Sequence, residues 1–205
     1  MTGGIPEPLF GDRFAGEQLM LSHFDPESNV VVFQIDHRTR PEQDAMLVDL
    51  ASGETTDLGQ SIYGNYFTAA GDDYETVVLA DGYTAGDTVL YLWDAERGER
   101  ELLYGVPLDA REEGQEVPLT GFMQGHWIDE VRGLLIPTVL FDDRGGLGYL
   151  RLEDPTSVEE VDIVGLVHEG VGELHDFEHL SGDRYLLDYN IDGVSWAYEA
   201  RFDQS

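Results

Sequence analysis

The sequence predicts an all-β fold, a β-propeller of about four four-stranded blades that form a partial ring or a four-bladed ring. The first observation is that apolar residues alternate with polar ones or stand in short aliphatic runs, such as Val30–Phe33 and Val77–Leu79. Turn-forming residues bound each run, and no segment shows an extended helical stripe. The second observation is a phrase that occurs twice, as AMLVDLASGETTDLG (45–59) and as LYLWDAERGERELLYG (90–105).

The repeat has a period that is typical of propeller blades. The acids Asp49, Asp94, Asp154 and Asp203 lie 45, 60 and 49 residues apart, and the longer middle interval contains an acidic insertion at 107–118. A single four-stranded sheet cannot bury both of its faces, so neighbouring units are expected to stack. We predict one domain, 1–205, with blades at approximately 16–60, 61–106, 119–165 and 170–205. A β-sandwich with similar hairpins is the alternative.

Each unit can be followed strand by strand. In the first, FDPESNVVVFQID (24–36) contains a turn between two strands, and a glycine turn at 51–54 joins the third strand to the fourth. The second unit runs from AAGDDYETVVLADG (69–82) into TVLYLWDAERGE (88–99). The third runs from WIDEVRGLLIPTVLFDD (127–143) into LGYLRLEDPTSVEE (147–160). The last, HLSGDRYLLDYNIDG (179–193) followed by SWAYEARFD (195–203), lacks a fourth strand.

These units resemble the blades of the propeller that precedes the catalytic domain in prolyl-oligopeptidase-type serine peptidases, and those of TolB-like proteins. The phrases LSGDRYLLDYN and FDPESNVVVFQID carry the resemblance, together with the hairpins MLVDLASGETTDLG and YLWDAERGERELLYG, over most of residues 16–203. The family's propeller usually has seven or eight blades. The family's nucleophile motif and hydrolase domain are absent from this sequence, so the chain resembles half of a propeller without its enzyme.

An incomplete ring leaves an open blade edge. The stretch 5–14 could supply the missing strand, two copies of the chain could join as a homo-oligomer, or a protein partner could cover the open side. The resemblance therefore implies a non-catalytic scaffold, gate or protein-interaction domain. The alternative is a small-ligand-binding or hydrolytic module at the mouth of the central channel, which would take a peptide or a small molecule.

The charge balance argues against nucleic acid as a partner and bears on the salt concentration in which the protein works. The chain has 205 residues with 42 acidic and 11 basic residues, all arginine, and a formal net charge of −31. Without basic patches, nucleic acid is not an expected partner. Carboxylate repulsion of this size favours adaptation to a salt-rich cytoplasm, and an unusually acidic mesophilic protein is the alternative. The absence of cysteine excludes disulfides and thiolate metal sites, and no run is long enough for a membrane helix or a signal peptide.

Three residues are the candidates for groups that face the channel, namely His126, Trp127 and His175. They fall at predicted first-strand positions, and the first strand of a blade lies innermost. We assign no catalytic residue, cofactor or metal ligand. Gly193–Ala197 resembles a nucleophile elbow, but Ser195 precedes an alternating strand pattern rather than a helix.

Three further groups of residues are interpreted as ordinary. His175 and His179 on one strand would stand about 13 Å apart, which is too far for one metal ion. The acid pairs Asp72-Asp73 and Asp142-Asp143 are predicted to be solvated. Most of a set of aromatic residues is predicted to pack within or between blades, namely Trp93, Trp127, Trp196, Tyr66 and Tyr149.

Overall fold

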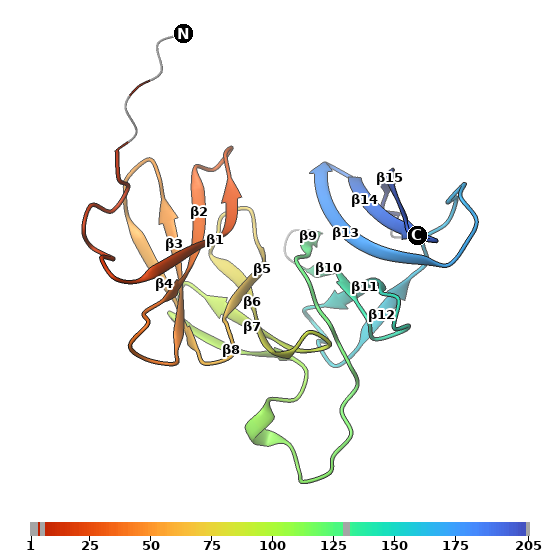
Figure 1. Ribbon diagram of the computed structural model, residues 1–205, viewed down its shortest axis with the longest axis horizontal. Coiled ribbons are helices and arrows are strands. Elements are labelled where there is room, and N and C mark those ends of the chain that lie inside the picture. Colours follow the sequence, from red (N-terminus) through yellow and green to blue (C-terminus); the bar gives the residue numbers. More distant parts are fainter. Residues whose placement is uncertain (1–3, 5–6, 129–131, 204–205) are drawn as a thin grey trace.

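Four antiparallel sheets make up the computed structural model, which describes residues 4, 7–128 and 132–203 (Figure 1). Blade 1 contains β1 (Gln18–Asp25), β2 (Val30–Asp36), β3 (Gln43–Asp49) and β4 (Thr55–Ser61). Blade 2 contains β5 (Tyr66–Ala70), β6 (Thr76–Thr84), β7 (Asp87–Asp94) and β8 (Glu99–Tyr104). Blade 3 contains β9 (His126–Ile128), β10 (Gly133–Thr138), β11 (Gly146–Arg151) and β12 (Val158–Val161). Blade 4 contains β13 (Gly172–Ser181), β14 (Arg184–Ile191) and β15 (Val194–Arg201).

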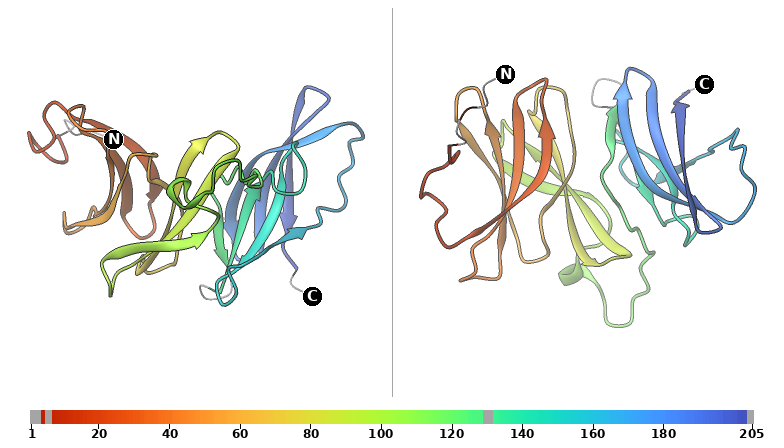
Figure 2. Two further views of the ribbon diagram at one scale, coloured as in Figure 1. Left: turned by 90° about the horizontal axis from the view of Figure 1, so that it is seen from below. Right: turned by 45° about the horizontal axis from the view of Figure 1, so that its top comes forward.

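The four-bladed propeller predicted from the repeat is confirmed. In every sheet the strands pair in chain order. The fourth blade has three strands, and no described strand pairs with the outer side of β15. Figures 1 and 2 show the blades in an open arc, with blade 1 and blade 4 at its two ends. The first strands β1, β5, β9 and β13 lie on the inside of this arc.

The recurring phrase of the sequence is the outer hairpin of a blade. In blade 1, Asp49 Oδ1 accepts hydrogen bonds from the backbone N–H groups of Ala51 (2.7 Å) and Ser52 (3.2 Å). Gly53 then adopts a positive φ of 78°, and its N–H donates to the Asp49 carbonyl at 2.8 Å. Asp94 and Gly98 repeat the second contact in blade 2, also at 2.8 Å. The phrase therefore recurs because an aspartate caps the turn and a glycine closes it.

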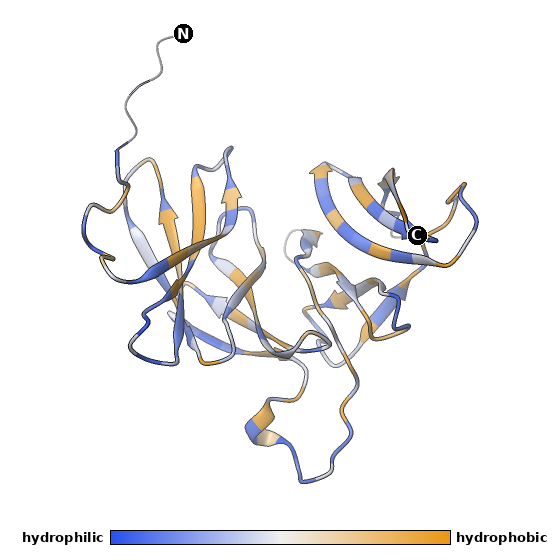
Figure 3. Cartoon of the chain, viewed as in Figure 1, coloured by the Kyte–Doolittle hydropathy of each residue, from blue (hydrophilic) through white to orange (hydrophobic). Residues whose placement is uncertain are grey.

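Strand alternation decides which side chains enter the cores between blades. Along β14, alternate side chains are buried towards blade 3, namely Tyr185, Leu187, Tyr189 and Ile191. Figure 3 shows the same alternation as bands of hydropathy along β13. Three apolar clusters result, one between each pair of neighbouring blades. This is the burial of both sheet faces that a single blade cannot achieve.

The outer faces of the two end blades differ, because the outer face of blade 1 is covered and that of blade 4 is polar. The outer face of blade 1 carries Met46 and Val48, and the rings of Phe10 and Phe14 pack against it. The described part of the N-terminal segment therefore covers blade 1 and supplies no strand to blade 4; Ile5 lies outside the described residues.

The outer face of blade 4 is largely polar. The side chains of β14 that alternate with the buried ones point to this outer face. They are Arg184, Leu186, Asp188 and Asn190, of which Leu186 is apolar. Neighbouring β15 adds Glu199, which pairs with Arg184 at 2.8 Å. A polar outer face is how terminal units of repeat proteins remain soluble.

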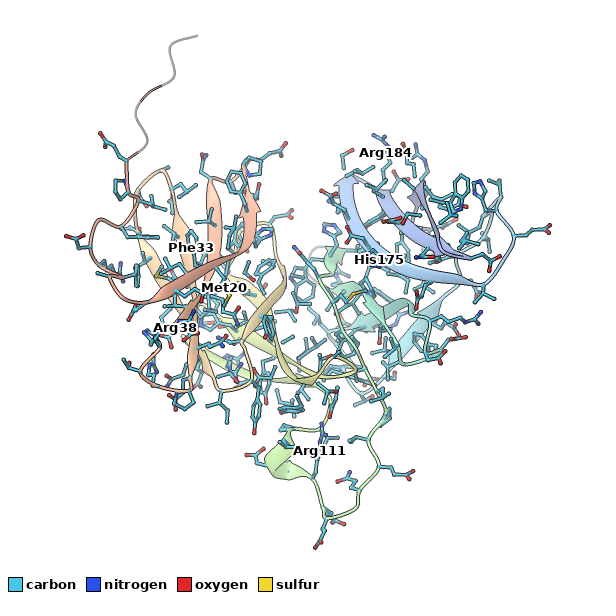
Figure 4. All side chains as sticks on the ribbon, in the orientation of Figure 1. Met20, Phe33, Arg38, Arg111, His175 and Arg184 are labelled. Carbon is cyan, nitrogen blue, oxygen red and sulfur yellow. The ribbon has the colours of Figure 1, made fainter. Side chains whose placement is uncertain are left out.

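The acidic insertion 107–118 forms a loop below blades 2 and 3 that contains a short 3₁₀ helix, η1 (Leu108–Ala110) (Figures 1 and 4). Arg111 holds the loop through two hydrogen bonds to the Asp87 carboxylate, at 2.6 and 2.8 Å. Further along, Thr120 Oγ1 donates to the Thr88 carbonyl at 2.6 Å. These contacts fix the path of the chain into β9. Among the described residues, no helix is long and apolar enough to cross a membrane.

Candidate ligand-binding cleft

A cleft of about 910 Å³ opens where the inner strands of the four blades converge. Its walls are the β1–β2 hairpin (21–28), β5 and the following turn (67–74), residues 124–127, and the β13–β14 hairpin (178–182). Every blade therefore contributes to the lining of the cleft. The first strands that supply part of this lining stand on the inside of the arc (Figure 2). This is where a propeller places its central channel.

One wall is a chain of hydrogen bonds that ends on a carboxylate. The Tyr74 hydroxyl donates to Asp25 Oδ2 at 3.1 Å, and it lies 3.0 Å from His23 Nε2. Because the hydroxyl proton is directed to Asp25, Nε2 of His23 must be the donor in this pair, which leaves Nδ1 to accept from the Gln124 amide at 3.5 Å. The His23 ring also stacks on Phe67, with centroids 4.2 Å apart. Burial lowers the pKa of His23, although Asp25 opposes the shift.

The opposite wall is a pair of stacked imidazoles. The rings of His126 and His179 lie 3.7 Å apart at an interplanar angle of 14°, and Tyr185 packs against both. His179 Nε2–H donates to the Gly182 carbonyl at 2.9 Å. Burial and then the neighbouring His179 lower the pKa of His126 to about 4. His126 is therefore a neutral ring at pH 7.

A glycine allows the chain to bring His126 to this place. Gly125 N–H donates to the Thr68 carbonyl at 2.9 Å, which ties the segment before β9 to β5. A Cβ atom at position 125 would lie 2.5 Å from the carbonyl oxygen of Leu135. Any other residue would therefore push β9 away from β10 and displace His126 from the wall of the cleft.

The structure brings two of the three predicted residues together. His126 and Trp127 both line the cleft, and the Trp127 ring is buried with its Nε1 unpaired. His175 is on β13 as predicted (Figure 4), but it is exposed and lies outside the cleft, where the register with β14 shifts between residues 174 and 176. Its strand neighbour His179 lines the cleft instead.

Sequence reasoning missed the first wall altogether. His23 lies on β1, the first strand of blade 1, so the criterion that selected His126 applied equally to it. Tyr74 follows β5 in a turn, where its positive φ of 58° directs the side chain across to blade 1. No periodicity in the sequence marks that conformation.

The other residues singled out in the sequence lie elsewhere or in ordinary surroundings. Ser195 is exposed on β15, opposite Asn190 of β14. Asp142 pairs with Arg144 on the surface, and this lowers the pKa of Asp142. Among the aromatic residues, Trp93, Trp127 and Tyr149 are buried, whereas Tyr66 and Trp196 are exposed. No three His, Asp or Glu side chains of the described residues are placed to hold one metal ion.

The rim of the cleft is acidic. Asp25, Glu27, Asp72 and Glu178 line it, and the described lining contains no arginine. The two lowered histidine pKa values leave His23 and His126 uncharged at neutral pH, so they do not offset the carboxylates. The cleft thus combines aromatic walls with a negative rim, which is an arrangement suited to a cationic group.

The comparisons with known proteins concern the fold. A dipeptidyl aminopeptidase IV-type protein from Bacteroides ovatus is similar with a TM-score of 0.56 and 12% identity, over 96% of this chain and 34% of that one. Prolyl oligopeptidase B from Galerina marginata, bound to a 35mer substrate, has a TM-score of 0.50 and 9% identity, over 95% and 35%. The chain thus spans about a third of these proteins. The resemblance to the peptidase propeller is confirmed as a likeness of fold.

TolB from Acinetobacter baumannii matches with a TM-score of 0.38 and 10% identity, over 92% of this chain and 55% of that one, which is too distant to carry an argument. No protein-family model and no curated sequence matches the chain.

Proposed function

We propose that this chain is a non-catalytic propeller module that recognises a positively charged peptide segment of another protein in the cleft between its four blades. The observation that carries the proposal is the composition of the cleft. Aromatic and neutral imidazole rings form the walls, and four carboxylates form the rim. The excess of carboxylates over the whole chain supports a salt-rich cytoplasm as the place where the module works.

The physical basis is electrostatic attraction combined with contact to ring faces. At low ionic strength a net charge of −31 raises the local concentration of cationic segments near the surface, and in concentrated salt the short-range contacts within the cleft remain. Within the cleft, the stacked pairs His23–Phe67 and His126–His179 offer flat faces to a guanidinium or ammonium group. Glu178, exposed on β13, can pair with the bound cation at the rim.

Peptide recognition agrees with the proteins of similar fold. The prolyl oligopeptidase B described above was solved bound to a 35mer substrate of hydrolysis and macrocyclization. Its hydrolytic activity belongs to the whole protein, of which this chain spans about a third. For this chain we therefore propose peptides as the class of ligand, and we propose no reaction.

Two matched peptides test the proposal. One is a fluorescent hexapeptide with two arginines, and the other has citrulline at both positions, which keeps the shape and removes the charge. We expect the arginine peptide to bind at least five-fold more tightly, which corresponds to about 1 kcal/mol. Equal binding of the two peptides would contradict the proposal.

A pair of variants on β13 locates the binding. Glu178→Gln removes a rim carboxylate, whereas Glu173→Gln removes a charge of the same strand outside the cleft. We expect the first to weaken arginine-peptide binding several-fold and the second to leave it nearly unchanged. If both variants weaken binding equally, the effect is due to net charge and the cleft is not the site.

A further inference from the structure

The outer strand of blade 4 is an uncovered edge. β15 spans eight residues, Val194–Arg201, and pairs with β14 in one unbroken register. On its other side no described strand is present, whereas blades 1, 2 and 3 each place a fourth antiparallel strand there. β15 contains no proline and no bulge, which are two of the devices that protect an edge, and its charged residues Glu199 and Arg201 lie in its C-terminal half.

The hairpin geometry shows which backbone groups face outwards. Asp192 and Gly193 form a two-residue turn with φ of 50° and 85°, so Ile191 and Val194 are a hydrogen-bonded pair. Pairs alternate along an antiparallel ladder. The N–H and C=O groups that point away from β14 are therefore those of Ser195, Ala197, Glu199 and Arg201.

Apolar surface lies beside these groups. Val194 is 50% exposed and Trp196 is 37% exposed, and both are on the face of β15 that continues into the core with Tyr198. The Trp196 ring stacks on His168 at 3.5 Å, which places the loop before β13 against this face. Val167, next to His168, is 78% exposed. In a chain this acidic, such a concentration of apolar side chains at an edge indicates contact with a partner.

The complete blades show what the missing strand contributes. Leu58 of β4 and Leu103 of β8 are buried in the clusters between blades, although three other residues of each strand are exposed. A fourth strand thus adds one or two apolar side chains to the inner face and pairs its backbone with the third strand. The edge of β15 lacks both contributions within the described residues.

We propose that β15 binds an extended segment of a partner protein by antiparallel strand addition. The segment has apolar residues at alternate positions, which would cover Trp196 and Val167, and basic or neutral polar residues between them. The charge of −31 favours a basic segment over a second copy of this chain, because two copies would repel each other. Backbone pairing would supply affinity, and the apolar positions would supply register.

Position 197 allows a selective test. Because the Ala197 N–H faces the open edge, Ala197→Pro removes a donor needed for strand addition without removing a bond to β14. Ala197→Thr keeps the donor and is the matched control. The probe is a ten-residue fluorescent peptide with valine at every second position and arginine or threonine between. A second probe has the same sequence with alternate backbone amides N-methylated, which keeps its charge and blocks its pairing.

We expect wild type and Ala197→Thr to bind the first peptide equally, and Ala197→Pro or N-methylation to weaken binding at least ten-fold. All of this binding is measured with excess unlabelled arginine hexapeptide to occupy the cleft, so Glu178→Gln should leave it unchanged, which separates the edge from the cleft. Amide hydrogen exchange of wild type provides a measurement that does not depend on a variant, because the peptide should protect Ala197 and Glu199. Unchanged exchange at these amides, or equal binding of the N-methylated peptide, would overturn the proposal. So would self-association of the wild-type chain alone that Ala197→Pro abolishes, because it would assign the edge to a second copy.

Discussion

Arg100 of β8 and Asp81 of β6 form a two-pronged ion pair across blade 2, with Nη2–Oδ2 and Nη1–Oδ1 distances of 2.9 and 3.0 Å. The Asp81 side chain is only 3% exposed. Arg100 also donates to the buried Asn65 at 2.7 Å, in the connection from blade 1. Its guanidinium lies over the Tyr91 ring, 4.2 Å from the centroid. One arginine of the fourth strand therefore contacts the second and third strands of blade 2 and the connection from blade 1.

Replacing Asp81 with asparagine is expected to destabilise the protein by about 3 kcal/mol, because it leaves a largely buried guanidinium without its counter-charge. Urea unfolding followed by tryptophan fluorescence measures this change. Glu199→Gln is the control, since it breaks the exposed pair with Arg184, and we expect little change from it. Equal effects of the two variants would show that burial of the Asp81 pair has no energetic consequence.

The blades were predictable from the sequence because their hairpins are local. The aspartate cap and glycine turn at Asp49–Gly53 are encoded within five residues, and alternation decides which face is buried. The way the ends of the arc are finished was not predictable. Phe10 and Phe14 show no periodicity, and the edge-to-face contact of Phe10 with Phe33 joins residues 23 positions apart in the sequence.

The cleft was only partly predictable for the same reason. His126 could be selected because first strands are innermost, but its stacking partner His179 comes from another blade, 53 residues later in the sequence. The exposure of His175 depends on a register shift in β13, which alternation alone does not reveal. The Tyr74 side chain of blade 2 reaches Asp25 of blade 1 because Tyr74 has a positive φ in the turn after β5, and the sequence pattern does not reveal that conformation.

The pKa of His126 predicts that stability increases with pH between about 4 and 6.5. The folded protein holds this ring neutral to a pKa of about 4, whereas the unfolded chain takes up a proton near 6.5. Between these values the unfolded state binds more protons, so stability is lost as pH falls and is fully present above 6.5. The loss is at most about 3 kcal/mol. Unfolding curves of wild type and His126→Gln from pH 4 to 7 test this, and the variant should show a smaller slope.

His37 is expected to have the opposite dependence. Its Nδ1 lies 2.7 Å from Glu17 and its Nε2 lies 2.8 Å from Asp44, and these carboxylates raise the pKa of His37 despite burial and the nearby Arg40. A raised pKa stabilises the fold below about 6.5, and this contribution is lost as pH rises through the folded value. His37→Gln should therefore lower stability at pH 6 more than at pH 9. A destabilisation that is constant across this range would contradict the expected charge on His37.

The N-terminal cover of blade 1 can be removed by substitution. Phe10→Ser combined with Phe14→Ser exposes Met46 and its neighbours, and we expect a loss of about 1–2 kcal/mol for each ring. Self-association should also increase, because an exposed apolar sheet face promotes association between molecules. Leu9→Ser is the control, since Leu9 is already 53% exposed. Sedimentation velocity in high salt measures the outcome, and a variant that stays as monomeric as the control would show that the rings do not protect this end.

Salt should stabilise the whole chain, because its carboxylates repel one another at a net charge of −31. The screening length falls from about 10 Å at 0.1 M to about 3 Å at 1 M, so most of the repulsion between surface carboxylates is screened over this range. We therefore expect Tm to rise steeply up to about 1 M KCl and more slowly beyond it. Sucrose of equal osmolarity separates screening from exclusion of the cosolute, and it should give a smaller rise without a plateau. A Tm that is flat or falls with KCl would show that the acidic surface is not what limits stability at low salt.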